Sequence, residues 1–121
     1  MIANTLVYLS GPISAKDGFS VEENVASALK VYLACIKVGV PAICVHLGAA
    51  FPSAFDVPYE TWMCYDFAMI DMSTHVLMLP HWRSSAGAVR EREYAEARGL
   101  RVFEDYAAML AAFSEQLRKA G

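Results

Sequence analysis

Short apolar segments alternate with segments of helical periodicity along this chain, and this alternation limits the possible folds more than any other feature. The apolar runs have no polar alternate face, which is typical of strands buried on both sides of a parallel sheet. We therefore predict an α/β three-layer sandwich, in which helices cover both faces of a mostly parallel sheet of four to five strands. The predicted strands span residues 6–9, 41–45, 75–79 and 100–103, and the predicted helices span 20–38, a segment from about 58, 85–99 and 106–119.

Local signals mark the ends of the predicted helices. Ser20 and Glu23 have the Ser-x-x-Glu spacing of a capping box, and Gly39 follows the last apolar residue of the same helical pattern. Pro58 suits the first turn of the second helix. The segment 46–57 between these helices is predicted to be a loop.

The length and composition of the chain limit its possible roles. Its 121 residues, of which 56% are hydrophobic, suit a single domain over 1–121 and exclude intrinsic disorder. A formal net charge of −3 lacks the basic field that binding to a nucleic-acid polymer requires. We expect a cytoplasmic protein with no membrane partner, because no apolar stretch approaches the ~20 residues of a membrane span and no leader pattern is visible. The cysteines include no Cys-x-x-Cys pair, so neither a disulfide framework nor a metal site is expected.

Ligands of parallel α/β sheets bind beyond the carboxyl ends of the strands. At this edge His46 and His81 are candidates to contact a substrate. Ser84, Ser85 and Gly87 stand at the start of the third helix, where free backbone N–H groups could hold an anion. Taken alone, these residues fit an ordinary serine N-cap better than an anion site. The loops expected at this edge span residues 10–20, 46–57 and 80–87.

Two carboxylates are the candidates for chemistry. Asp66 shares a helical face with Trp62 and Ile70, and a carboxylate inside this apolar arc needs a partner or has a raised pKa. Either condition is also what a catalytic acid or base requires, and the structural alternative is an Asp that caps a neighbouring loop. Glu91 lies about 60° from a stripe of small residues on its helix and Glu93 about 140° from it, so Glu91 is predicted to face the strand ends and Glu93 the solvent. Paired carboxylates suit glycosidic chemistry, in which one attacks the anomeric carbon and the other assists the leaving group.

Several motifs occur in an order that resembles a known family. They are Tyr8-Leu9-Ser10-Gly11-Pro12-Ile13, Tyr65-Asp66, Leu79-Pro80 with Trp82, and Ser85-x-Gly87-x-x-x-Glu91-x-x-x-Ala95-x-x-x-Gly99. Over roughly residues 5–104 the sequence resembles the nucleoside 2-deoxyribosyltransferase-like superfamily. That superfamily includes nucleoside 5′-monophosphate N-glycosidases and small uncharacterised phage and bacterial members. The resemblance implies a single flavodoxin-like or Rossmann-like domain.

The resemblance also implies roles for individual residues. Glu91 becomes the nucleophile, Asp66 assists protonation or orientation of the leaving base, and Tyr8 positions the nucleophile and sugar, although Tyr8 also suits a core aromatic. Ser85 stands where the transferases have Asp, which favours a hydrolase with a 5′-phosphate at the start of this helix. The loop after the first strand lacks the Arg with which those hydrolases contact phosphate, and Lys16 is its nearest cation. The expected substrate-binding residues are Ser10, Gly11, Pro12, Ile13, His46, Ser84, Ser85 and Gly87.

The expected function is cleavage of the N-glycosidic bond of a nucleoside 5′-monophosphate or deoxynucleoside, by hydrolysis or transfer, through a covalent glycosyl–Glu91 intermediate. No cofactor or metal is expected. The alternative is a non-catalytic module that binds or senses a nucleotide or an ADP-ribose-like ligand, and a flavin carrier is a third possibility. We expect a homodimer or larger homo-oligomer, for which Phe51, Trp62 and Trp82 could supply interface anchors unless they are buried in the core.

Overall fold

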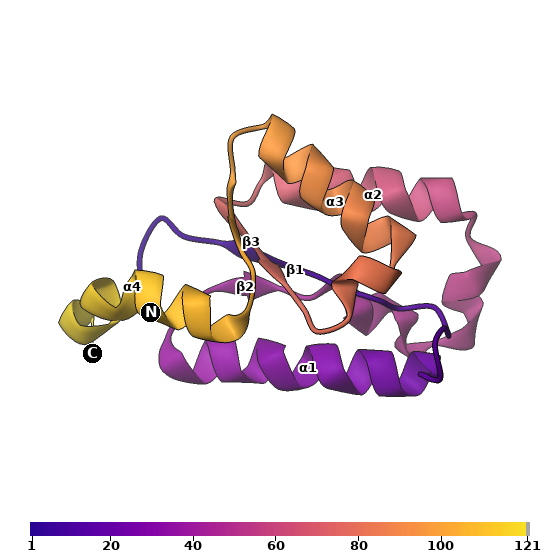
Figure 1. The fold of residues 1–121 in the computed structure, drawn as a ribbon, viewed down its shortest axis with the longest axis horizontal. Helices are drawn as coiled ribbons and strands as arrows, with labels where there is room; N and C mark the ends of the chain where they lie inside the picture. Colours follow the sequence, from indigo (N-terminus) through magenta and orange to yellow (C-terminus); the bar gives the residue numbers. More distant parts are fainter. Residues whose placement is uncertain (121) are drawn as a thin grey trace.

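A parallel sheet lies between two pairs of helices in the computed structural model, which describes residues 1–120 (Figure 1). This arrangement confirms the predicted α/β sandwich. No helix in the described part of the chain is long and apolar enough to cross a membrane. The strands are β1 (Val7–Ser10), β2 (Ala42–Ile43), β3 (His75–Met78) and β4 (Arg101–Phe103), and the helices are α1 (Val21–Val38), α2 (Tyr59–Asp71), α3 (Ala86–Ala97) and α4 (Tyr106–Ala120).

The strands lie in the order β2-β1-β3-β4, and every neighbouring pair is parallel. The chain moves from β1 to β2 on one side and then crosses to β3 on the other side of β1. The order therefore reverses between β1 and β3, where Ser10 pairs with Met78. In sheets of this kind, the crevice beyond the carboxyl ends of the two strands at the reversal is the usual ligand site.

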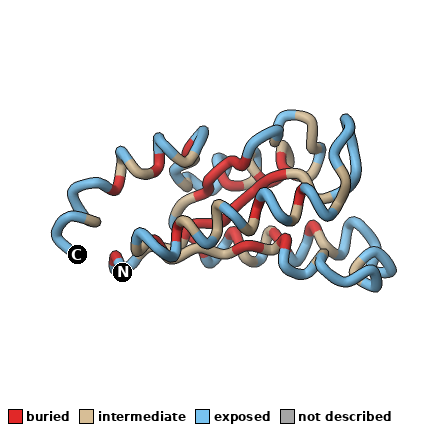
Figure 2. Tube along the Cα trace, turned by 90° about the horizontal axis from the view of Figure 1, so that it is seen from below, coloured by how far each residue is buried: buried red, intermediate tan, exposed pale blue. Residues whose placement is uncertain are grey.

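Successive side chains of each strand point to opposite faces of the sheet and separate the core into two clusters. Helices α1 and α4 cover one face, and α2 and α3 cover the other (Figure 1). Buried residues run through the middle of the molecule, while the outer surfaces of the helices are exposed (Figure 2). The first cluster includes Val7, Leu9, Leu77, Phe103, Met109 and Phe113, and the second includes Tyr8, Val76, Met78, Ile70, Ala88 and Ala95.

The predicted end signals of α1 are confirmed. The Ser20 side chain accepts a hydrogen bond from the backbone N–H of Glu23, and the Glu23 side chain accepts one from the backbone N–H of Ser20. Gly39 ends the helix in the left-handed conformation with φ of 97°, which glycine adopts without steric cost. Pro58 is the N-cap of α2 and so precedes the first turn in which it was expected.

The segment predicted as a loop over 46–57 is more regular than expected. It forms two 3-10 helices, η1 (Val45–Ala50) and η2 (Pro52–Asp56), and a third, η3 (Trp82–Ser84), follows β3. Short 3-10 turns are common connectors, because their i to i+3 hydrogen bonds satisfy the backbone without a long helix. The bond from the Ala54 N–H to the Phe51 carbonyl oxygen is an example. Sequence periodicity misses such turns because they are too short to show one.

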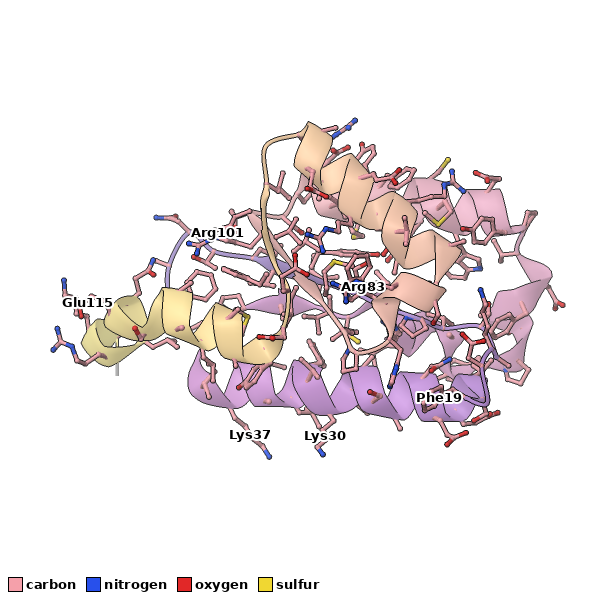
Figure 3. The ribbon with its side chains drawn as sticks, in the orientation of Figure 1. Phe19, Lys30, Lys37, Arg83, Arg101 and Glu115 are labelled. Carbon is pink, nitrogen blue, oxygen red and sulfur yellow. The ribbon has the colours of Figure 1, made fainter. Side chains whose placement is uncertain are left out.

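Both chain termini lie at the left of Figure 1, whereas the loops that follow β1 and β3 lead toward its right-hand side. Figure 3 shows Phe19 at the N-terminal end of α1, on that side, while Lys30 and Lys37 point away from the sheet. The chain therefore keeps its ends away from the crevice at the carboxyl ends of the strands.

Candidate functional site

A cavity of about 440 Å³ lies at the crevice between the loops that follow β1, β2 and β3. Its volume falls within the range of about 300–1,000 Å³ that is usual for small-molecule sites. Eight of the eleven predicted site residues line it. They are Gly11, Pro12, Ile13, Asp66, Ser84, Ser85, Gly87 and Glu91.

Glu91 lies on the buried face of α3, and only 5% of its surface is exposed. The Ser10 hydroxyl donates a hydrogen bond of 2.7 Å to its Oε1 atom. Burial, together with the neighbouring Asp66 carboxyl, holds the pKa of Glu91 well above the usual range of a carboxyl. Glu93 is exposed, as the helical spacing predicts. The structure thus confirms which of the two glutamates faces inward.

Asp66 approaches the same place from α2, and 6% of its surface is exposed. Burial raises the pKa of Asp66, although contacts with Glu91 and Tyr8 oppose this rise. Two buried carboxyls this close resist losing both protons, because the second negative charge would be repelled by the first. The pair can therefore present one ionised carboxylate and one protonated acid, which are the two groups that glycosidic cleavage uses.

Tyr8 sits behind the two carboxyls and does not line the cavity. Burial, and then the negative charges of Glu91 and Asp66, raise the pKa of its hydroxyl well above the ordinary value. Within the described residues, the hydroxyl oxygen has no hydrogen-bond partner of good geometry. Tyr8 is therefore both a core aromatic of the α2 and α3 face and a neighbour of the carboxyl pair.

His46 was expected to contact substrate, but the structure places it beneath the loop that follows β1. It is buried, it does not line the cavity, and its Nε2 atom lies 3.2 Å from the carbonyl oxygen of Gly11. Burial lowers the pKa of His46 to about 4, so the ring is neutral and donates this hydrogen bond through Nε2. His46 therefore lies next to a residue of the cavity wall, Gly11, but its side chain does not reach the cavity. The direction of this side chain depends on packing.

The start of α3 forms one wall of the cavity. Ser85 is the N-cap, and its hydroxyl accepts a hydrogen bond of 3.1 Å from the backbone N–H of Ala88. A Cβ on Gly87 would lie 3.4 Å from the Tyr59 hydroxyl, so α2 closely approaches the start of α3 here. Ser85 is therefore the predicted N-cap, and an anion would meet the N–H groups of the first turn other than that of Ala88.

The loops after β1 and β3 touch at two points beside this wall. The Lys16 Nζ atom donates a hydrogen bond of 2.8 Å to the Ser84 carbonyl oxygen. The rings of Phe19 and His81 lie 4.7 Å apart between their centroids. All four residues line the cavity. These contacts place Lys16, whose side chain lines the cavity, near the N-terminus of α3.

Sequence reasoning missed Asn24 and Phe19. Asn24 is buried on α1 and donates hydrogen bonds of 3.2 and 3.1 Å to the carbonyl oxygens of Ile13 and Ser14, which shapes the loop after β1. Its position four residues before the buried Ala28, on the same helical face, was the available signal. Phe19 carries no such signal, because its contact with His81 joins two loops that are distant in sequence.

A further wall of the cavity is largely apolar and comes from η1, η2 and α2. Trp62 has one polar atom there, and its indole N–H donates a hydrogen bond of 2.8 Å to the Ala54 carbonyl oxygen. The apolar side chains of this wall include Val45, Ala49, Ala54, Phe55, Val57, Trp62 and Met63. A flat, weakly polar group would fit against them.

No group of three His, Cys, Asp or Glu side chains that could hold a metal ion occurs within residues 1–120. The groups available for chemistry in the cavity are the two neighbouring buried carboxyls, Glu91 and Asp66, and the nearby N-terminus of α3.

The fold and the site together define a doubly wound α/β protein with two buried carboxyls in a cavity at its topological switch point. The chain belongs to the family described as Domain of unknown function (DUF4406), whose model matches residues 5–104. The matched segment includes all four strands and every residue that lines the cavity, whereas α4 follows it. A comparison with curated proteins finds no match.

Proposed function

We propose that this protein cleaves the N-glycosidic bond of a nucleoside 5′-monophosphate or deoxynucleoside, by hydrolysis or by transfer to a second base. The observation that carries the proposal is the pair of buried carboxyls, Glu91 and Asp66, at the cavity of the topological switch point. The order of motifs, which resembles the nucleoside 2-deoxyribosyltransferase-like superfamily, supports the same chemistry. We also propose that the chain is related to that superfamily.

In the proposed reaction, the ionised Glu91 carboxylate attacks the anomeric carbon of the sugar. The carbon–nitrogen bond breaks, its electron pair stays on the base nitrogen, and the proton of Asp66 neutralises the departing base. Water, or a second base, then attacks the same carbon and releases Glu91 as a carboxylate. The proton lost by this nucleophile returns to Asp66. Two displacements at one carbon retain its configuration.

Two walls of the cavity suit the two ends of such a substrate. The apolar wall beside Trp62 would take the base, since its side chains offer flat, weakly polar surface. A 5′-phosphate would lie at the start of α3, where the first backbone N–H groups and the nearby Lys16 ammonium favour an anion. The carboxyls of Glu91 and Asp66 would then lie near the bond between sugar and base.

A panel of nucleosides and nucleoside 5′-monophosphates tests this proposal by chromatography of released free base. The wild-type protein should release base from at least one compound. Glu91→Gln should abolish release, because it removes the attacking anion while nearly keeping the shape. Glu93→Gln is the matched control on the exposed face of the same helix and should retain activity. The absence of release from every compound by folded wild-type protein would refute the proposal.

A second candidate function is binding without turnover. The observation that favours it is the raised pKa of Glu91, which results first from burial, because a protonated carboxyl is a poor nucleophile. Calorimetry with the same nucleotides, and with ADP-ribose, distinguishes the candidates. A binding module should hold a ligand tightly and return it unchanged, whereas the proposed enzyme should return free base.

A further inference from the structure

Ser10 places a hydroxyl at a position of the sheet where an apolar side chain is expected. It is the last residue of β1, it is fully buried, and alternation along the strand directs its side chain to the α2 and α3 face together with Tyr8. Its backbone is held by the neighbouring strand, since its carbonyl oxygen accepts a hydrogen bond of 2.8 Å from the Leu79 N–H. A buried hydroxyl is costly unless it is hydrogen-bonded.

The partner of this hydroxyl is Glu91, which lies 81 positions further along the chain. The distance of 2.7 Å from Ser10 Oγ to Glu91 Oε1 is typical of a well-formed hydrogen bond from a hydroxyl donor. Glu91 lines the cavity and Ser10 does not. One oxygen of the carboxyl, Oε1, is therefore held by the last residue of β1, whereas Ser10 does not bind Oε2.

We propose that Ser10 is the positioning residue of Glu91, which holds Oε1 and leaves Oε2 as the oxygen that reacts with substrate. This inference rests on the proposed function, because it assigns the reacting oxygen of the proposed nucleophile. The resemblance to the superfamily implies that Tyr8 positions the nucleophile. In this chain, the hydroxyl with good hydrogen-bond geometry to Glu91 is that of Ser10.

The same hydrogen bond influences where the proton of the carboxyl pair resides. A hydroxyl that donates to Glu91 stabilises its ionised form, and this contact lowers the pKa of Glu91 against the larger effects of burial and of the neighbouring Asp66, which both raise it. Asp66 receives no such bond from Ser10. The Ser10 hydroxyl therefore favours the arrangement in which Glu91 is the carboxylate and Asp66 is the acid.

The test compares three variants of the full chain. Ser10→Ala removes the hydroxyl, and Ser10→Thr keeps it. Ser73→Ala is the matched control, because Ser73 is also buried and donates a hydrogen bond of 2.9 Å, but to the Met69 carbonyl oxygen at the end of α2. Two readouts are needed, namely the kinetics of base release and a carbon-13 NMR titration of the glutamate carboxyls without substrate.

We expect Ser10→Ala to lower kcat roughly tenfold to a hundredfold, as for the loss of a hydrogen bond to a charged group, with little change in KM. The acid limb of its kcat–pH profile and the titration of Glu91 should both move to higher pH. Ser10→Thr, which keeps the hydroxyl, should retain the wild-type kcat and titration, and Ser73→Ala should change neither.

Wild-type kcat and wild-type titration of Glu91 in Ser10→Ala would overturn the proposal, as would equal effects of Ser10→Ala and Ser73→Ala. The two proposals fail in different ways. If no compound releases base, the proposed function fails. The titration, which needs no substrate, then still shows whether Ser10 controls the ionisation of Glu91.

Discussion

His46 is a neutral histidine inside the fold, with 1% of its surface exposed. Its Nε2–H group bonds to the Gly11 carbonyl oxygen, and its Nδ1 atom has no partner among residues 1–120. Burial lowers the pKa of His46 from 6.5 to about 4. Protonation of Nδ1 would place an unpaired charge in the interior. We therefore predict that protonation of this side chain contributes to the destabilisation of the fold by acid.

The sign and the size of the effect follow from the two pKa values. Below pH 6.5 the unfolded chain binds a proton at His46, whereas the folded protein does so only near pH 4. The unfolded state therefore gains free energy as the pH falls through this window. Since one pKa unit corresponds to about 1.4 kcal/mol, the full loss of stability between pH 7 and pH 4 is about 3 kcal/mol.

Urea unfolding of wild-type protein and His46→Gln, at pH values from 7.5 to 4, measures this loss. Gln keeps an N–H donor near the position of Nε2 and does not titrate. The stability advantage of the wild type over the variant should shrink by about 3 kcal/mol on acidification. The raised pKa values of Asp66 and Glu91, caused by burial, act in the opposite sense but are shared by both proteins and cancel. His81→Gln, at an exposed position, is the control. A difference that stays constant over this pH range would refute the reasoning.

Other predictions concern the site and its walls. Glu91→Gln should raise the free energy of unfolding at pH 7.5 by about 0.5–2 kcal/mol, and with it the thermal midpoint, because burial raises the pKa of Glu91 and the ionised form therefore destabilises the fold. A lower midpoint would contradict this. Asp66→Asn should slow base release most for poor leaving groups, which a series of substituted bases measures. Gly11→Ala should lower the free energy of unfolding in urea by about 1–3 kcal/mol, because the added Cβ would lie 2.6 Å from the Cβ of Leu79. Gly48→Ala is the control, since its added Cβ would make only ordinary contacts. Phe51 is 70% exposed and is a candidate anchor of the expected homo-oligomer. Phe51→Ser should therefore weaken the association of the chains, which sedimentation measures.

The sequence alone was sufficient where a feature depends on residues that are close along the chain. The capping box of Ser20 and Glu23 and the turn at Gly39 involve neighbours within one helical turn, so their spacing predicts them directly. The burial of Asp66 and Glu91 follows from helical periodicity in the same way, because the face that a side chain occupies depends only on its position along a helix. Apolar strands without a polar face were enough to predict a parallel sheet covered on both sides.

Only the tertiary structure decided which of these groups meet. Ser10 and Glu91 are 81 positions apart, and their hydrogen bond depends on how α3 packs against β1. The same holds for His46, which lies on a predicted loop but points beneath Gly11 because a buried neutral ring fits there. Local patterns determine which elements form and which faces they bury. The contacts between elements depend on strand order and packing, which no short stretch of sequence contains.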